Sequence, residues 1–204
     1  HSGPGIDAHR LDGVVVGVAD LPTRFGEFRI VAFWNNRDAK EHVAVVHGDV
    51  LDRDDVPTRM HSECLTGDAL GSLRCDCRDQ LETALRGIAR HECGLVLYLR
   101  QEGRGIGLAN KMRAYSLQDQ GFDTVEANHR LGFEDDERDF RIGSEILKSM
   151  GFDQVQLLTN NPKKLEMMTA YGLTVSERVP LKVGENPHNQ AYLATKAQKS
   201  GHLL

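Results

Sequence analysis

The sequence predicts an α/β protein in which a β-rich N-terminal part leads into a mixed sheet flanked by helices, all in a single compact domain. Short strand-like segments fill the first fifty residues and are separated by proline, glycine and aspartate turn signals. Beyond residue 80, segments with helical spacing alternate with short apolar runs, the order typical of an α/β sheet. The length of 204 residues suits one substantial domain, and no linker or repeat divides it.

Three segments are expected to form the β-rich part: GVVVGVAD from Gly13, EFRIVAFW from Glu27 and HVAVVHGDV from His42. The residues before Gly13 read as a disordered terminus or an expression remnant, so we expect the domain to span residues 13–204. The sequence contains no run of eighteen apolar residues, and its start has no apolar signal core. We therefore expect a cytoplasmic protein that does not cross a membrane.

The middle of the chain predicts a helix, a buried strand and a second helix. Apolar residues of the first helix share the spacing of one helical face: Leu81, Leu85 and Ile88. The run Leu95–Leu99 is continuously apolar, which is typical of a parallel strand covered on both faces. A glycine-rich turn then opens the second helix, which should carry three residues on one side: Leu108, Met112 and Tyr115.

The C-terminal half repeats this alternation of helices and strands. The expected elements are a helix around Ile142–Met150, a strand at Val155–Thr159, a helix at Lys163–Tyr171 and a final strand, LTVSERV. The motif Asn160-Asn161-Pro162 marks the start of the third of these, because asparagine caps helices and proline suits the first helical position. Gly172 marks its end.

The charge balance is mildly acidic, with 25 Lys and Arg against 30 Asp and Glu and a net charge of -5. Proteins that bind nucleic acid in general usually carry a basic surplus, so we expect no nucleic-acid partner. Any anionic ligand must therefore be held by a local cluster of basic side chains.

Three of the four cysteines lie in one short stretch: Cys64, Cys75 and Cys77. In a reducing compartment such a cluster more often binds metal than forms disulfides. Three thiolates predict one zinc ion per chain with a position left open for water, as in a catalytic site. The alternatives are a structural site closed by a fourth ligand such as His61, or cysteines without metal. Cys93 stands apart and is expected to be a small buried hydrophobe.

Two clusters of polar residues follow predicted strands. The segment Gln101–Gly107 lies between a buried strand and a helix, where backbone N–H groups favour an anion. A plain tight turn explains its glycines about as well, but not Arg104. The segment Asn160–Lys164 places lysines in a first helical turn, where they oppose the dipole unless an anion binds; solvated surface lysines are the alternative. Because ligands collect at the carboxyl ends of strands in such sheets, the two clusters predict a polyphosphate site.

The run GFEDDERDFRIG crowds charged residues at positions 135–139. One interpretation is a solvated face or a capping turn. The other is an arginine held by carboxylates near a phosphate, beside an aspartate that moves a proton. Tyr115 is open to two interpretations in the same way, since it either packs in the core or presents its hydroxyl to a partner.

These motifs resemble the GTP cyclohydrolase II family from about Gly13 to the C-terminus. The most specific blocks are RMHSECLTGDALGSLRCDC, LRQEGRGIGLANKMRAYSLQDQG, DTVEANHRLGFEDDERDF and LLTNNPKKLEMM. The resemblance implies zinc-dependent hydrolysis of GTP in the first step of riboflavin biosynthesis. The guanine imidazole ring would open at C8, with release of formate and pyrophosphate, to give 2,5-diamino-6-(5-phosphoribosylamino)pyrimidin-4(3H)-one. The resemblance also implies Mg²⁺ on the substrate phosphates and a homodimer.

The resemblance further assigns roles to individual residues. Cys64, Cys75 and Cys77 would be the zinc ligands, and Tyr115 would take part in hydrolysis of the formyl intermediate. Asp136 would be the proton acceptor and Arg138 a nucleophile toward the α-phosphate, although a permanently protonated guanidinium is equally suited to stabilise charge. The implied GTP-binding residues are Arg59, Met60, His61, Ser62, Glu63, Gln80, Glu102, Gly103, Arg104, Thr124, Thr159 and Lys164.

Two other functions remain open at this point. One is a paralogue that stops at the formamidopyrimidine intermediate, which would be expected if the tyrosine were replaced. The other is a zinc-stabilised nucleotide-binding module without turnover.

Overall fold

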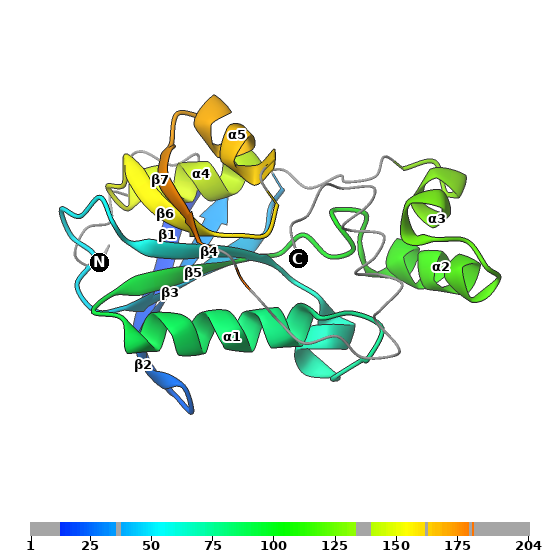
Figure 1. Ribbon diagram of the computed structural model, residues 1–204, viewed down its shortest axis with the longest axis horizontal. Helices are drawn as coiled ribbons and strands as arrows, with labels where there is room; N and C mark the ends of the chain where they lie inside the picture. The colour runs from blue at the N-terminus through cyan, green and yellow to red at the C-terminus, as the bar shows by residue number, and fades with distance from the viewer. Residues whose placement is uncertain (1–12, 36–37, 134–139, 162, 180, 182–204) are drawn as a thin grey trace.

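The computed structural model describes residues 13–35, 38–133, 140–161, 163–179 and 181 (Figure 1). Its strands are β1 Gly13–Thr23, β2 Gly26–Asn35, β3 Glu41–His47, β4 Pro57–Ser62, β5 Gly94–Leu99, β6 Gln154–Leu158 and β7 Thr174–Val179. Its helices are the π-helix η2 Leu65–Ala69 and the α-helices α1 Cys77–Arg90, α2 Leu108–Asp119, α3 Thr124–Arg130, α4 Phe140–Ser149 and α5 Lys163–Ala170. Within these ranges, no helix is long and apolar enough to span a bilayer.

The strands form one mixed sheet in the order β1-β2-β3-β5-β4-β6-β7. The first three strands and β5 pair antiparallel, whereas β5, β4, β6 and β7 pair parallel. The β-rich N-terminal part and the helix-flanked sheet predicted from the sequence are thus confirmed. Because β4 and β5 are parallel neighbours at the centre, their carboxyl ends meet at one edge of the sheet.

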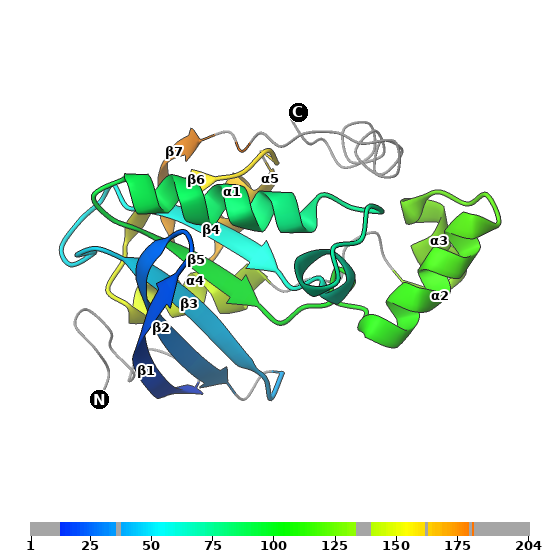
Figure 2. The same ribbon diagram turned by 90° about the horizontal axis from the view of Figure 1, so that it is seen from below.

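Helices cover both faces of the sheet, with α1 on one face and α4 and α5 on the other (Figures 1 and 2). The strand β5 contributes to both layers, because alternate side chains point to opposite faces. Its Leu95, Leu97 and Leu99 belong to the large core that also includes residues of α4, whereas Val96 packs with Ala84 and Ile88 of α1. Burial on both faces explains why this strand is continuously apolar.

The central strand β4 is the main element that the sequence patterns do not predict. Its side chains are largely buried, yet three of them are polar: Thr58, Arg59 and His61 are 0%, 7% and 2% exposed. A buried strand is recognised in a sequence by its apolar run, and β4 has none. The short helices η2 and α3 also lack the apolar periodicity that would announce them.

The prediction for the buried face of α2 is wrong. Leu108 and Met112 are exposed, at 41% and 39%, whereas the buried residues of this helix are Lys111 and Ala114. The helix lies with α3 beyond the carboxyl ends of β4 and β5 rather than over the sheet (Figure 2). It therefore turns a polar side toward the chain segments that follow those strands.

Candidate active site

One cleft lies at the carboxyl ends of the parallel strands, and the segments after β4, β5 and β6 contribute to its walls. Across it stand α2 and α3, which supply Tyr115 and Thr124. The segments after β4 and β5 are tied together, since the backbone N–H of Glu63 donates to the carbonyl of Leu99 at 2.8 Å. The sheet thus brings together residues that are more than a hundred positions apart in the sequence.

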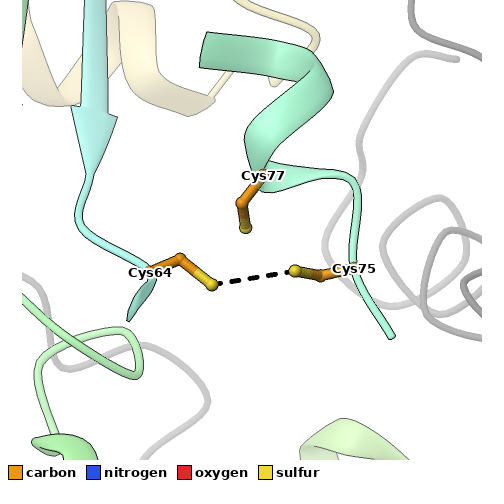
Figure 3. Close-up of side chains that lie close together, drawn as sticks. All are labelled: Cys64, Cys75 and Cys77. Atoms are coloured by element: carbon orange, nitrogen blue, oxygen red, sulfur yellow. Dashed lines mark hydrogen bonds between the residues drawn. The ribbon is translucent and has the colours of Figure 1, made fainter. Parts of the chain in front are cut away.

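The three cysteines predicted to bind zinc lie close together (Figure 3), and all three line this cleft. Cys64 follows β4, Cys75 lies in the loop before α1, and Cys77 is the first residue of α1. Their sulfur atoms all lie within 4.8 Å of one another. Two thiolates on one tetrahedral zinc have sulfur atoms about 3.8 Å apart, and the Sγ atoms of Cys64 and Cys75 are 3.7 Å apart. The donor set and spacing therefore fit a zinc ion.

The π-helix η2 holds Cys64 in place. Cys64 caps its N-terminus, with Sγ accepting from the backbone N–H of Gly67 at 3.4 Å, and its own N–H donates to Asp68 at 3.0 Å. Gly67 must lack a side chain, because a Cβ there would lie 2.8 Å from Cys75 Sγ and 3.2 Å from Cys64 Sγ. The turn and the sulfur cluster are built as one unit.

Hydrogen bonds among the three thiols give them different pKa values. Bonds from Cys75 and Cys77 lower the pKa of Cys64, and Lys111 adds to this effect. The bond with Cys64 raises the pKa of Cys75 to about 11, and bonds to both neighbours raise that of Cys77. Cys64 is therefore the first of the three to ionise, and metal binding must remove the protons of the other two.

His61 does not belong to the sulfur cluster. Its Nε2 lies 3.0 Å from both carboxylate oxygens of Asp68, and its ring stacks on Tyr98. Burial lowers the pKa of His61, so the ring is neutral at pH 7. Asp68 also accepts from the Tyr98 hydroxyl at 2.7 Å. These contacts give His61 a partner other than a metal and do not support its role as a fourth ligand.

Eleven of the twelve residues that the family resemblance implies for GTP binding line the cleft; Glu102 is the exception. They come from β4 and its end, α1, the turn after β5, α3, the end of β6 and α5. The lining members are Arg59, Met60, His61, Ser62, Glu63, Gln80, Gly103, Arg104, Thr124, Thr159 and Lys164. The structure gathers this set, while its contact with a nucleotide stays a prediction.

Several of these side chains already have protein partners. Arg59 donates to the carbonyl of Leu158 and to the amide oxygen of Gln80, each at 3.0 Å. The Gln80 amide donates in turn to Asp76 at 2.7 Å, and Glu63 accepts from Arg100 at 2.9 Å. A guanine ring that meets Gln80 or Glu63 must share these bonds.

The glycine-rich turn after β5 has the backbone of a specialised loop. Gly103, Arg104, Gly105 and Gly107 all have positive φ, at 64°, 60°, 94° and 89°. This region is costly for a side chain such as that of Arg104, and such strain is typical of functional loops. This conformation is consistent with the prediction that a plain tight turn does not explain the presence of Arg104.

Lys164 is buried, at 7% exposed, and its Nζ lies 5.8 Å from the centre of the Phe140 ring. The alternative of a solvated surface lysine is therefore wrong for this residue. Thr159, which directly follows β6, is 1% exposed and also lines the cleft. The predicted catalytic residues Asp136 and Arg138 lie outside the described residues.

Tyr115 lines the cleft, and its hydroxyl lies 3.2 Å from the hydroxyl of Thr66, which in turn lies 3.6 Å from Cys64 Sγ. The guanidinium of Arg74 lies 4.2 Å from the centre of its ring. Burial raises the pKa of Tyr115, so the hydroxyl keeps its proton at neutral pH. The interpretation of Tyr115 as a core residue is replaced by one in which its polar end faces the site.

Sequence reasoning missed Arg74, Asn128 and Lys111, all of which line the cleft. Glu102 is a predicted GTP contact whose carboxylate accepts from the backbone N–H of Leu65 and from the ammonium of Lys111, and its contact with GTP stays a prediction. The sequence did contain a signal for Lys111, because this residue stands one helical turn before Tyr115 and so shares its face of α2.

Comparison with known proteins identifies the family. The model of the GTP cyclohydrolase II family matches residues 14–180. GTP cyclohydrolase-2 of Citrobacter koseri is 59% identical over 189 residues, 93% of this chain and 96% of that protein. The proteins of the same name from Shigella boydii and Escherichia coli strain HS are each 58% identical over the same shares.

Among solved structures, a two-domain 3,4-dihydroxy-2-butanone 4-phosphate synthase from A. baumannii aligns with a TM-score of 0.45 and 17% identity. The alignment covers 82% of this chain and 40% of that one. The sequence matches cover nearly the whole length of this chain and of its relatives. The chain therefore belongs to the GTP cyclohydrolase II family of hydrolases.

Proposed function

We propose that this protein binds zinc through Cys64, Cys75 and Cys77 and hydrolyses GTP to 2,5-diamino-6-(5-phosphoribosylamino)pyrimidin-4(3H)-one, formate and pyrophosphate, as the first step of riboflavin biosynthesis. The observation that carries the proposal is one cleft whose lining contains both three clustered thiols and buried or strained basic residues. Such a cleft suits a ligand with a reactive ring and several phosphates.

Zinc, when bound to the three thiolates, supplies a Lewis acid that activates water at neutral pH. Around it the chain supplies a neutral phenol at Tyr115 and the hydroxyl of Thr66, 3.2 Å apart. Because Tyr115 remains protonated, it is able to donate a hydrogen bond to an oxygen that develops at C8 of the base. We assign it this role in the hydrolysis that releases formate.

The basic residues of the cleft would hold the triphosphate. Arg59 is fixed by two hydrogen bonds, and Arg104 lies on the glycine-rich turn. Lys164 lies in the first turn of α5, near the positive end of the helix dipole. Mg²⁺ would join them by neutralising phosphate oxygens while keeping most of its water. We assign Asp136 and Arg138 to cleavage at the α-phosphate, with Arg138 as charge stabiliser or nucleophile.

We further infer that the protein acts in the cytoplasm as a homodimer. The four free cysteines agree with a reducing compartment. The homodimer rests on the family alone, and size-exclusion chromatography with light scattering would show a monomer if this part is wrong.

The direct test incubates the purified protein with GTP, Zn²⁺ and Mg²⁺ and measures formate, pyrophosphate and the mass of the pyrimidine product. We expect formate and pyrophosphate in equal amounts from GTP and none from ATP. A formylated pyrimidine without formate would indicate the paralogue that stops early. Bound GTP without any product would indicate a nucleotide-binding module instead.

A further inference from the structure

Lys111 is a buried cation beside the sulfur cluster, and the proposed chemistry gives this lysine no role. It lies on α2 and is 9% exposed, whereas Leu108 and Met112 of the same helix face outward. Its Nζ donates to Cys64 Sγ at 3.0 Å and to Glu102 Oε1 at 2.6 Å. Burying an ammonium is costly unless it is paired, so both contacts are needed to keep it there.

Glu102 fixes the position of this ammonium. Its Oε2 accepts from the backbone N–H of Leu65 at 2.9 Å, and its Oε1 accepts from that of Gly103 at 3.0 Å. The carboxylate therefore joins the turn after β5 to the π-helix that Cys64 caps. Lys111 completes the connection by linking Glu102 to the sulfur atom itself.

A zinc ion with three thiolates carries one net negative charge in a partly buried site. A cation in direct contact with one sulfur lowers the cost of that charge, and groups that hydrogen-bond to metal ligands tune the metal. The hydrogen bond also draws electron density from Cys64, which weakens its donation to the metal and leaves the metal more electrophilic. Lys111 makes such a contact, because its ammonium donates directly to Cys64 Sγ.

We propose that Lys111 is a positioning residue of the metal centre: held by Glu102, its ammonium stabilises the Cys64 thiolate and sets both the metal affinity and the electron donation of that sulfur. This inference rests on the proposed zinc site. It also gives a function to Glu102, which does not line the cleft.

The test compares the full-length protein with Lys111→Met after exchange of zinc for Co²⁺, whose thiolate charge-transfer band reports the sulfur donors. We expect the band of Lys111→Met to move to longer wavelength, because a sulfur without its hydrogen bond donates more readily. We also expect chelator competition to show zinc affinity lower by about 10- to 100-fold. Lys148→Met, which removes a lysine from the last turn of α4, should change neither measurement.

The variant Lys111→Met/Glu102→Gln guards against misfolding, because it removes the ammonium without leaving an unpaired buried carboxylate. It should show the same displaced band and weaker zinc binding. If either variant folds and keeps the wild-type band and affinity, the inference is wrong. If instead the wild-type protein gives no thiolate-to-cobalt band, the zinc site fails, and the proposed function fails with it.

Discussion

The strands β4 and β5 are parallel neighbours in the centre of the sheet, and both are buried, but they are made of different residues. In β5, four apolar residues fill the two cores on either side: Leu95, Val96, Leu97 and Leu99. In β4, Arg59 and His61 are also buried, and each has hydrogen-bonding partners outside the strand: Arg59 bonds Leu158 and Gln80, and His61 bonds Asp68 of η2. A buried polar group costs free energy unless it is paired, so β4 depends on the site around it, whereas β5 stabilises the fold directly.

The substitution Gly67→Ala should disturb the metal site most strongly while leaving the two cores unchanged. Its new methyl group would meet the sulfur of Cys75 at 2.8 Å, so we expect loss of bound zinc and a fall in formate production of at least 100-fold. Metal content and formate are the measurements. The matched control is Gly87→Ala in α1, where nothing lies within 4 Å of the new atom. A Gly67→Ala protein with full zinc content would contradict the packing described above.

Tyr115→Phe removes one hydroxyl near the sulfur cluster and leaves the ring. We expect ring opening to continue while formate release falls by about 10²-fold, the usual range for losing one proton-donating or hydrogen-bonding group. Mass spectrometry should then detect an accumulated formylated pyrimidine. Formate release at the wild-type rate would exclude the role assigned to Tyr115.

Arg59→Met tests the β4 side of the comparison. The substitution makes β4 more like β5, so we expect the free energy of unfolding to change by less than about 2 kcal/mol, the cost of leaving the amide oxygen of Gln80 without the Arg59 donor. Because a cation is lost from the cleft, kcat/KM for GTP should fall by about tenfold or more. Chemical denaturation and steady-state kinetics give the two values. A large stability loss with unchanged kinetics would reverse our interpretation of this strand.

Leu97→Ala tests the β5 side and should affect the site least. Leu97 is fully buried, and its truncation should lower the free energy of unfolding by about 2–5 kcal/mol. Activity per folded molecule, and zinc per folded molecule, should stay near the wild-type values. A selective loss of activity at temperatures where the variant is folded would show that the core and the site are not separable in this way.

The same contrast explains which parts of the structure could be predicted from the sequence. Apolar runs and spacing predicted β5, α1, α4 and β6, because these elements are defined by burial against the cores. The patterns missed β4 and chose the wrong face of α2, because polar contacts with the site position both elements. Lys111 illustrates the limit: its burial depends on Cys64 and Glu102, and no local pattern shows that these meet.

The candidate site was more predictable than the strand that carries it. Cysteine spacing indicated the metal cluster, and family motifs indicated the lining of the cleft, because chemistry requires particular residue types whatever their local structure. Spacing alone left open whether His61 is a fourth metal ligand. Only the fold shows that its ring bonds Asp68 and stacks on Tyr98 instead.

The central claim, that the three thiols hold a zinc used in hydrolysis rather than one needed for folding, is tested most directly by Cys64→Ser. The measurement is formate production from GTP, together with thermal unfolding of the same sample. We predict that formate production is abolished while a cooperative unfolding transition remains, because the large apolar core includes none of the three clustered cysteines. An unfolded Cys64→Ser protein would indicate a structural metal, and wild-type formate production would contradict the account outright.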